Sequence, residues 1–247
     1  MSTTSLLRRA GNTVYQRAFP LYRPLYAAYK AYADRAEREL LRKILFQGAV
    51  VADVGANIGI YSRFLSRYVG PGGLVHSFEP YGDNFSRLFT ATRDLCNVRC
   101  IQAAVGERSG DCKLYISDEL NVDHRAYSAV GDSRRAVSTR MLALDDYFKP
   151  GERLDLIKMD VQGYELHALR GAERVLQENM DIKLLLELWP AGLEQAGVKW
   201  KQVIELLNRF NMTISIVRNA GSVPFDPRHV RNEISWYVNI FAHRSLR

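Results

Sequence analysis

The sequence lacks the features that would place this chain in or across a membrane. It contains no run of about 18 apolar residues, the length that a membrane-spanning helix needs. Residues 1–9 show no apolar block followed by a small-residue cleavage site, so we expect no secretory signal there. Because 47% of the residues are hydrophobic, the chain can still build the core of one domain. These features predict a cytoplasmic protein.

Cysteine is scarce and odd in number, which excludes a disulfide framework as the main source of stability. The three cysteines have no histidine at the spacing of a zinc finger. They are therefore expected to be reduced thiols of an intracellular protein, and we expect no structural zinc site. The cysteines concerned are Cys96, Cys100 and Cys112.

An even spread of positive charge is also missing. The net charge is +7, but residues 1–43 alone hold nine Lys and Arg against three acidic residues. The remainder of the chain is nearly balanced, which argues against a dedicated nucleic-acid surface. We therefore expect no nucleic-acid partner.

The most informative stretch, residues 50–64, lacks both common nucleotide motifs. It has neither the G-x-G-x-x-G of dinucleotide folds nor the lysine of a triphosphate loop. Instead, a β-branched run leads into D-x-G-x-x-x-G and then into a helical pattern, as in open α/β sheets that bind ligands at strand ends. An acid before the turn suits the amino group and sulfonium of S-adenosylmethionine (SAM); a chance pair of glycines in an ordinary strand–turn–helix unit is the alternative. The predicted ligands of the methionine part are Asp53, Gly55, Ala56, Asn57 and Gly59.

A second acid supports a nucleotide-like ligand. Glu79 ends the predicted strand 74–79, about 20 residues after the turn, where a carboxylate binds ribose hydroxyls in such folds. Pro80 ends the strand and is placed in the same site. The end of the next strand, at Ala104, is expected to flank the adenine, because small side chains leave room for the ring.

The order of elements predicts an α/β fold. Strands alternate with helices up to residue 188, and two strands, 212–218 and 234–241, close the chain. This order is typical of a mostly parallel sheet of seven strands with helices on both faces and one reversed strand. A strand at 98–105 is expected in that sheet, and 111–117 with 136–142 forms an inserted strand pair.

The N-terminal segment is expected to be an extension, residues 1–45, before a main domain at 46–247. Residues 25–46 have apolar positions at steps of three and four, which predict one amphipathic helix. Pro20 and Pro24 are expected to break any helix before it. The helix could cap one side of the domain, act as a lid over the substrate, or contact an anionic membrane or lipid-linked acceptor.

A polar loop at 118–135 is a candidate for the chemistry, because long loops in compact domains are usually functional. His124 is our first candidate for a general base, since an imidazole titrates near neutrality. Asp123 or Asp160 could orient it. The alternative is a solvated loop histidine.

Asp160 is the second catalytic candidate, because it ends the buried strand 154–160 where ligands of open α/β sheets lie. It could face the acceptor or only fix the strand end. Glu187, near the end of the next strand, could join Asp160 in holding Mg²⁺, although we predict no metal. Glu165 is interpreted as an acid in the first turn of a helix.

The ordered set of motifs resembles the FkbM-type family of SAM-dependent methyltransferases over residues 45–190. The resemblance implies a class I (Rossmann-like) methyltransferase fold and O-methylation of a hydroxyl on a sugar, glycolipid or polyketide-type molecule. Many members carry Glu where this chain has Gln162, which cannot act as a base. The motifs are Asp53–Gly59, 78–80, 142–146, 157–165, 169–171 and 184–188.

Two other functions are alternatives to a methyltransferase. An NAD-linked oxidoreductase would need the missing G-x-G-x-x-G motif. A non-catalytic SAM-fold scaffold could dock on a membrane or a glycosyltransferase through the N-terminal helix. The sequence favours the enzyme, with SAM as cofactor and a small-molecule or glycan hydroxyl as acceptor.

Overall fold

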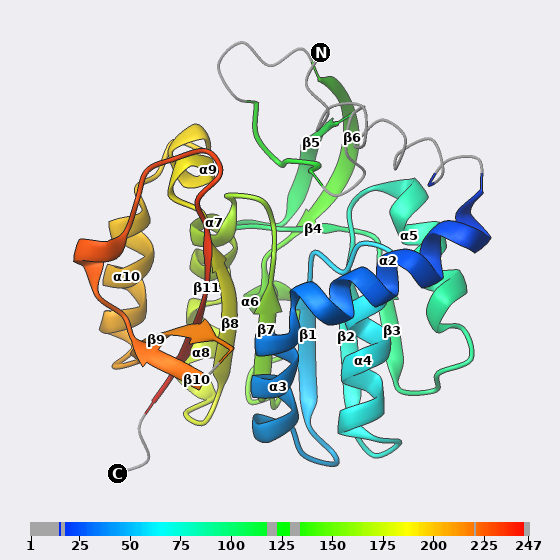
Figure 1. The fold of residues 1–247 in the computed structure, drawn as a ribbon, viewed down its shortest axis with the longest axis horizontal. Coiled ribbons are helices and arrows are strands. Elements are labelled where there is room, and N and C mark those ends of the chain that lie inside the picture. The colour runs from blue at the N-terminus through cyan, green and yellow to red at the C-terminus, as the bar shows by residue number, and fades with distance from the viewer. Residues whose placement is uncertain (1–14, 16–17, 118–122, 129–133, 220, 245–247) are drawn as a thin grey trace.

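The computed structural model describes residues 15, 18–117, 123–128, 134–219 and 221–244. In this part of the chain a central sheet of eight strands is covered by helices on both faces (Figure 1), as expected for the α/β class. Five neighbouring strands are parallel, and the last three join by antiparallel pairing. In spatial order they are β10 (Gly221–Pro224), β9 (Thr213–Arg218), β11 (Val238–His243), β8 (Lys183–Leu188), β7 (Leu156–Met159), β1 (Val50–Val54), β2 (Leu74–Phe78) and β3 (Val98–Ile101).

Alternating side chains of the buried strands supply two cores. Val51 packs in a cluster with Leu41 and Leu65 on one face, whereas Ala52 and Val54 belong to a larger cluster on the other. The first face carries α3 (Arg35–Ile44), α4 (Ile60–Val69) and α5 (Gly82–Thr92). Helices contributing to the second cluster are α6 (Leu144–Tyr147), α7 (Glu165–Arg170), α8 (Glu173–Glu178), α9 (Pro190–Gln195) and α10 (Trp200–Arg209).

The sheet differs from the expected seven strands at both edges. The predicted strand 98–105 is two strands, because the chain leaves the central sheet after Ile101 and β4 (Ala104–Val105) pairs with another partner. That partner belongs to a small sheet of β4, β6 (Arg135–Leu142) and β5 (Gly110–Ile116), which contains the predicted strand pair. At the other edge, β10 forms an unpredicted hairpin with β9, and β11 begins at Val238 rather than 234. A short 3-10 helix, Pro227–His229, lies between them.

The N-terminal helix is longer than expected and is broken elsewhere. The segment folds as two helices, α2 (Phe19–Ala33) and α3, which are separated by a break at Asp34. The expectation that Pro20 and Pro24 prevent a helix is wrong. Pro20 lies in the first turn, where its missing N–H costs nothing, and Pro24 removes one bond in a helix whose aromatic side chains stack along it. Residues 1–14 and parts of the loop 118–135 lie outside the described residues.

No helix within the described ranges is both long and apolar enough to cross a bilayer.

Strand register determines which polar residues meet at the carboxyl edge of the sheet. Val54 pairs with both Phe78 and Met159, so the residues that follow these three strands leave the sheet at one level. Met159 pairs with Leu186, which brings Asp160 level with Glu187. The predicted strand-end acids therefore share one edge.

Candidate active site

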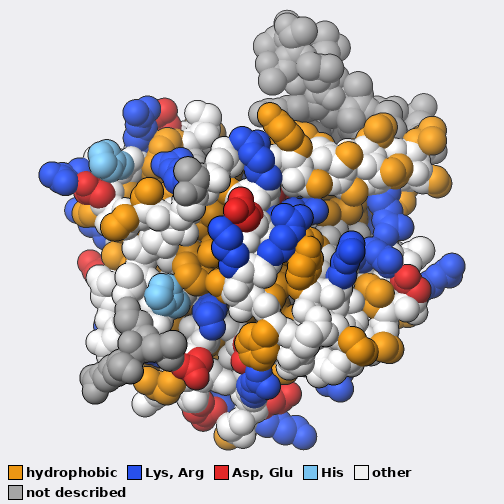
Figure 2. All heavy atoms as spheres, turned by 60° about the horizontal axis from the view of Figure 1, so that its bottom comes forward, with side chains coloured by type: hydrophobic (Ala, Val, Ile, Leu, Met, Phe, Trp, Pro, Cys, Tyr) orange, Lys and Arg blue, Asp and Glu red, His pale blue; other side chains and the backbone are white. Residues whose placement is uncertain are grey.

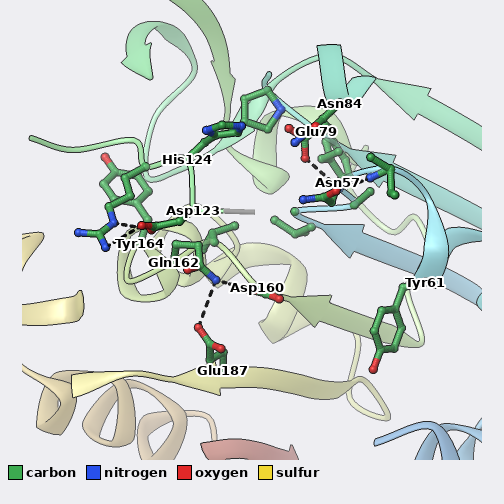
Figure 3. A pocket seen from close by; sticks show the side chains of 18 of the residues that line it. Asn57, Tyr61, Glu79, Asn84, Asp123, His124, Asp160, Gln162, Tyr164 and Glu187 are labelled. Carbon is green, nitrogen blue, oxygen red and sulfur yellow. Dashed lines mark hydrogen bonds and ion pairs between the residues drawn. The ribbon is translucent and has the colours of Figure 1, made fainter. Parts of the chain in front are cut away.

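A cavity of about 680 Å³ lies at this edge (Figure 3). Its walls come from the ends of β1, β2, β7 and β8, from the loop at 123–126, from α2 and from the segment before β11. Six of the eight predicted cofactor ligands line it: Gly55, Ala56, Asn57, Glu79, Pro80 and Ala104. The other two, Asp53 and Gly59, do not reach the cavity wall.

The turn after β1 is held by backbone contacts. The N–H groups of Gly55 and Ala56 donate to the carbonyl of Phe78 at 3.0 and 2.9 Å, which joins the turn to β2. Gly55 has φ 79°, and a Cβ at this position would lie 2.0 Å from the carbonyl oxygen of Asp160. The absent side chain therefore lets the ends of β1 and β7 approach, in addition to any space it leaves for a ligand.

Gly55→Ala is expected to lower the free energy of unfolding by about 2–5 kcal/mol, since it adds a clash to a left-handed backbone. Gly197→Ala is the matched control, because Gly197 has φ 82° but no atom within 4 Å of its Cβ position. That variant should lose only about 1–2 kcal/mol. Urea unfolding of both variants measures the difference, and equal losses would contradict a close approach at Gly55.

Glu79 is fixed from two loops. Its Oε2 accepts the N–H of Asn57 at 2.9 Å (Figure 3), and its Oε1 accepts the N–H of Tyr81 at 3.0 Å. The residue is only 5% exposed, and burial raises the pKa of Glu79 to about 7 against the lowering effect of these bonds and of Asn84. Asn84, a cavity residue that the sequence analysis missed, also accepts the Tyr15 hydroxyl.

Asp53 lies beneath the turn rather than facing the cavity. Its Oδ2 accepts the hydroxyl of Ser62 at 2.7 Å, and its Oδ1 lies 3.8 Å from Nζ of Lys158. Burial raises the pKa of Asp53, while Lys158 and Ser62 lower it. Asp53 stays a predicted site residue, but its contacts are those of a group that supports the turn.

Lys158 is a site residue that the sequence analysis missed. It is buried in β7, and its Nζ lies 3.8 Å from Asp53, 3.9 Å from Oδ2 of Asp160 and 4.8 Å from the ring centroid of Tyr61. A signal was present in the sequence, because a lysine two residues before Asp160 in an apolar strand must point to the same face as that acid.

Gln162 joins the two acids at the ends of β7 and β8. Its Nε2 donates to Oδ1 of Asp160 at 2.7 Å and lies 3.5 Å from Oε2 of Glu187 (Figure 3). Burial raises the pKa of Glu187 well above its ordinary value, and the negative charge of Asp160 raises it further. Gln162, at φ 55°, therefore supplies a hydrogen-bond donor between the carboxyl groups. Within the described ranges no three His, Cys, Asp or Glu residues are placed to share a metal ion.

The strained loop that carries Gln162 is held by hydrogen bonds to Glu165 and Tyr127. Glu165, fully buried, accepts the N–H groups of Val161 and Gly163 at 3.1 and 3.3 Å. The hydroxyl of Tyr127 donates to the carbonyl of Gln162 at 2.8 Å. Burial raises the pKa of Glu165 to about 7. These contacts hold the loop in a conformation that it would not adopt alone.

His124 lines the cavity on the side of Glu79, away from Glu187 (Figure 3). Its Nδ1 accepts the N–H of Ser117 at 3.2 Å, so the neutral ring carries its proton on Nε2. The carboxylate of Asp123 binds Arg125 and Arg134 at 2.8 and 2.6 Å, so it is engaged by these arginines rather than by His124. In this tautomer Nε2 carries the ring proton, so it can donate a hydrogen bond but cannot accept a proton.

Helix α2 forms an aromatic wall of the cavity. Tyr22, Tyr26 and Tyr29 line it, with the rings of Tyr22 and Tyr26 stacked at 5.3 Å. Lys30, on the same face, forms an ion pair of 2.6 Å with Asp34. Part of the predicted N-terminal extension therefore contributes to the cavity wall.

The residues of this cavity fit SAM. Glu79 offers a carboxylate whose two oxygens are held in position, which suits two neighbouring ribose hydroxyls. The small side chains of Ala103 and Ala104 face the cavity beside it and leave space for a flat base. The turn at residues 55–58 completes the wall next to Asp160.

Comparison with known proteins gives methyltransferases as relatives of this chain. Hexuronic acid methyltransferase AglP of Haloferax volcanii is 26% identical over 191 residues, 74% of this chain and 73% of that protein. Methyltransferase sdnD of Sordaria araneosa is 26% identical over 182 residues, 58% of this chain and 68% of that protein.

Solved structures show the same fold at low identity. Fibrillarin of Aeropyrum pernix, in complex with natively bound S-adenosyl-L-methionine, matches 84% of this chain and 74% of its own with a TM-score of 0.50 and 16% identity. An rRNA methylase from Streptococcus thermophilus matches 84% of this chain and 93% of its own with a TM-score of 0.50 and 14% identity. The predicted class I methyltransferase fold is confirmed.

The sequence profile described as the methyltransferase FkbM domain matches residues 53–221, more than half of the chain. The protein is thus a methyltransferase with SAM as its cofactor, and it belongs to the FkbM methyltransferase family.

Proposed function

We propose that the protein O-methylates a hydroxyl of a sugar, glycolipid or polyketide-type small molecule. Asp160 carries the proposal, since it is a carboxylate on the cavity wall, held by Gln162, at the same sheet edge as the turn after β1. A hydroxyl is a weak nucleophile while protonated, so its methylation needs a base. Aromatic rings of Tyr22, Tyr26 and Trp189 on the wall suit the apolar faces of a sugar or polyketide.

In the proposed mechanism each polar residue has a role that its contacts support. Oδ2 of Asp160 accepts the hydroxyl proton while Gln162 holds Oδ1, and the positive charge of Lys158 steadies the carboxylate. Glu187, whose raised pKa favours its protonated form, donates a hydrogen bond to the acceptor. SAM supplies an electrophilic methyl group when bound. We assign its binding to the six wall residues given above, with Asp53 and Gly59 supporting the turn.

His124 remains a second candidate for the base. It would have to change tautomer, since a proton accepted at Nε2 requires Nδ1 to carry the other one and the bond from Ser117 to break. We therefore propose Asp160 as base and His124 as a hydrogen-bond donor. We also propose residues 46–247 as the methyltransferase domain and 1–45 as the extension that completes its acceptor side.

Incubation with methyl-labelled SAM and fractionated glycans, lipids and small metabolites tests the acceptor class. The label is expected in a product that survives alkaline hydrolysis, because an ether is stable to base whereas a methyl ester releases methanol. Asp160→Asn is the matched control and should leave the product unlabelled. A label that alkali releases would contradict hydroxyl methylation, since a carboxylate acceptor needs no base. The alkaline hydrolysis is needed because a hexuronic acid, the substrate class named for the relative AglP, carries both hydroxyl and carboxylate groups.

A further inference from the structure

Helix α2 presents an entirely apolar outer face. The two charged residues of α2, Arg23 and Lys30, are half-buried and do not belong to the exposed face. Every exposed residue of the helix is apolar or aromatic. Leu21, Leu25 and Tyr32 are 67%, 70% and 72% exposed. A surface of this kind marks an interaction site rather than an ordinary solvated helix. The exposed residues, here called the α2 face, are Pro20, Leu21, Pro24, Leu25, Ala28, Tyr29, Ala31, Tyr32 and Ala33.

A basic groove runs beside the α2 face. It is formed by α2, α3, α4 and the end of α5, and Figure 2 shows Lys and Arg side chains beneath the hydrophobic ones of this region. Among its described lining residues Asp94 is the sole acid, and it forms an ion pair of 2.6 Å with Arg63. The arginines of the groove are Arg23, Arg38, Arg42, Arg63 and Arg67.

Most of these arginines are available to an anion. The structure shows no ion pair between a described carboxylate and Arg23, Arg38, Arg42 or Arg67. Aromatic rings hold two of them in place: the guanidinium of Arg38 lies 5.1 Å and that of Arg42 5.7 Å from the ring centroid of Phe64. Guanidinium groups fixed in this way are suited to phosphate oxygens.

The α2 face is continuous with the mouth of the SAM cavity. Tyr29 belongs to both, being 62% exposed and part of the cavity wall. Ile234 and Tyr237 also line the cavity and are 77% and 57% exposed. An object that covers the α2 face would therefore lie against the opening of the active site.

We propose that the α2 face and the arginine groove dock this protein on an anionic lipid bilayer. An apolar helix face flanked by arginines is the pattern of a helix that lies in the plane of the interface, with apolar side chains among the acyl chains and cations at the headgroups. Charge complementarity selects an anionic surface, because the groove has four unpaired cations and no unpaired described acid. Docking would place the mouth of the cavity against the bilayer, whatever the chemistry of the acceptor.

Vesicle flotation of the full chain tests this proposal. Binding is expected to vesicles of phosphatidylcholine mixed with phosphatidylglycerol, to fall as salt rises, and to be much weaker with phosphatidylcholine alone. Arg67→Gln should weaken binding about fivefold, the effect of one basic residue near an anionic surface. Leu25→Glu should weaken it by about tenfold or more, because an apolar side chain can no longer enter the interface.

Two matched variants control for the chemistry of the changes. Met180→Glu alters a side chain that is 63% exposed before β8, and Lys201→Gln removes one charge from α10; neither residue lines the groove. Both should bind vesicles as the parent protein does, and titration calorimetry with SAM should show all four variants folded. Equal binding by Arg67→Gln, Leu25→Glu and their controls would overturn the proposal. The proposal would also be overturned if the protein formed a dimer that Leu25→Glu dissociates while vesicle binding is unchanged. The α2 face would then bind a second copy of the chain.

Discussion

Asp160→Asn is expected to lower the rate of methyl transfer by about 10²- to 10⁴-fold, the usual contribution of a general base. Asparagine keeps the shape of the side chain and can still accept the hydrogen bond from Gln162. It cannot accept a proton from the acceptor hydroxyl. Because we assign Asp160 to the acceptor rather than to SAM, SAM affinity measured by calorimetry should change little. Single-turnover kinetics with labelled SAM measure the loss.

His124→Ala separates the two candidate bases. Its Nδ1 is occupied by the N–H of Ser117, so its loss should reduce turnover far less than the loss of Asp160. A thermal unfolding curve for each variant distinguishes lost chemistry from lost structure. If His124→Ala were inactive and Asp160→Asn retained full turnover, the base would be His124 and the proposed roles would be exchanged.

SAM affinity is expected to fall about tenfold from one pH unit above the pKa of Glu79 to one unit below it. This carboxyl has a pKa raised to about 7 by burial, and the ribose hydroxyls of SAM donate hydrogen bonds that favour the ionised form. Binding must therefore release a proton from the fraction of molecules in which Glu79 is protonated. The affinity for SAM is therefore expected to increase as the pH rises through 7. Calorimetry in buffers of different ionisation enthalpy measures both the affinity and the number of protons released.

Glu79→Gln is the control for this pH dependence. The amide keeps the size of the side chain but removes the charge, so affinity above pH 7 should fall by about 10- to 100-fold, in line with hydrogen bonds to an ionised group. The same variant should bind SAM equally across the pH range and release no proton. A parent protein whose affinity does not change with pH would show that another residue holds the ribose.

The sequence alone determined the class of the fold and the direction of the site. Apolar runs followed by Gly55, Glu79 and Asp160 predicted parallel strands whose polar ends meet, because strand ends in such sheets share one edge. The family resemblance came from the same local motifs. Local chemistry was sufficient at these positions, since each residue directly follows the strand that places it.

The tertiary structure decided what depends on packing between distant segments. Register across β1 and β7 turned Asp53 toward Lys158 rather than toward the cavity, and a hydrogen bond from Ser117 selected the tautomer of His124. Packing of α2 against the cavity placed Tyr22 and Tyr26 on its wall and left Leu21, Leu25 and Tyr32 exposed on the outer face, although both sets lie along one helix. The physical reason is common to all three: a side chain's role follows from its partners, and these partners lie on other strands or helices whose distances no local pattern encodes.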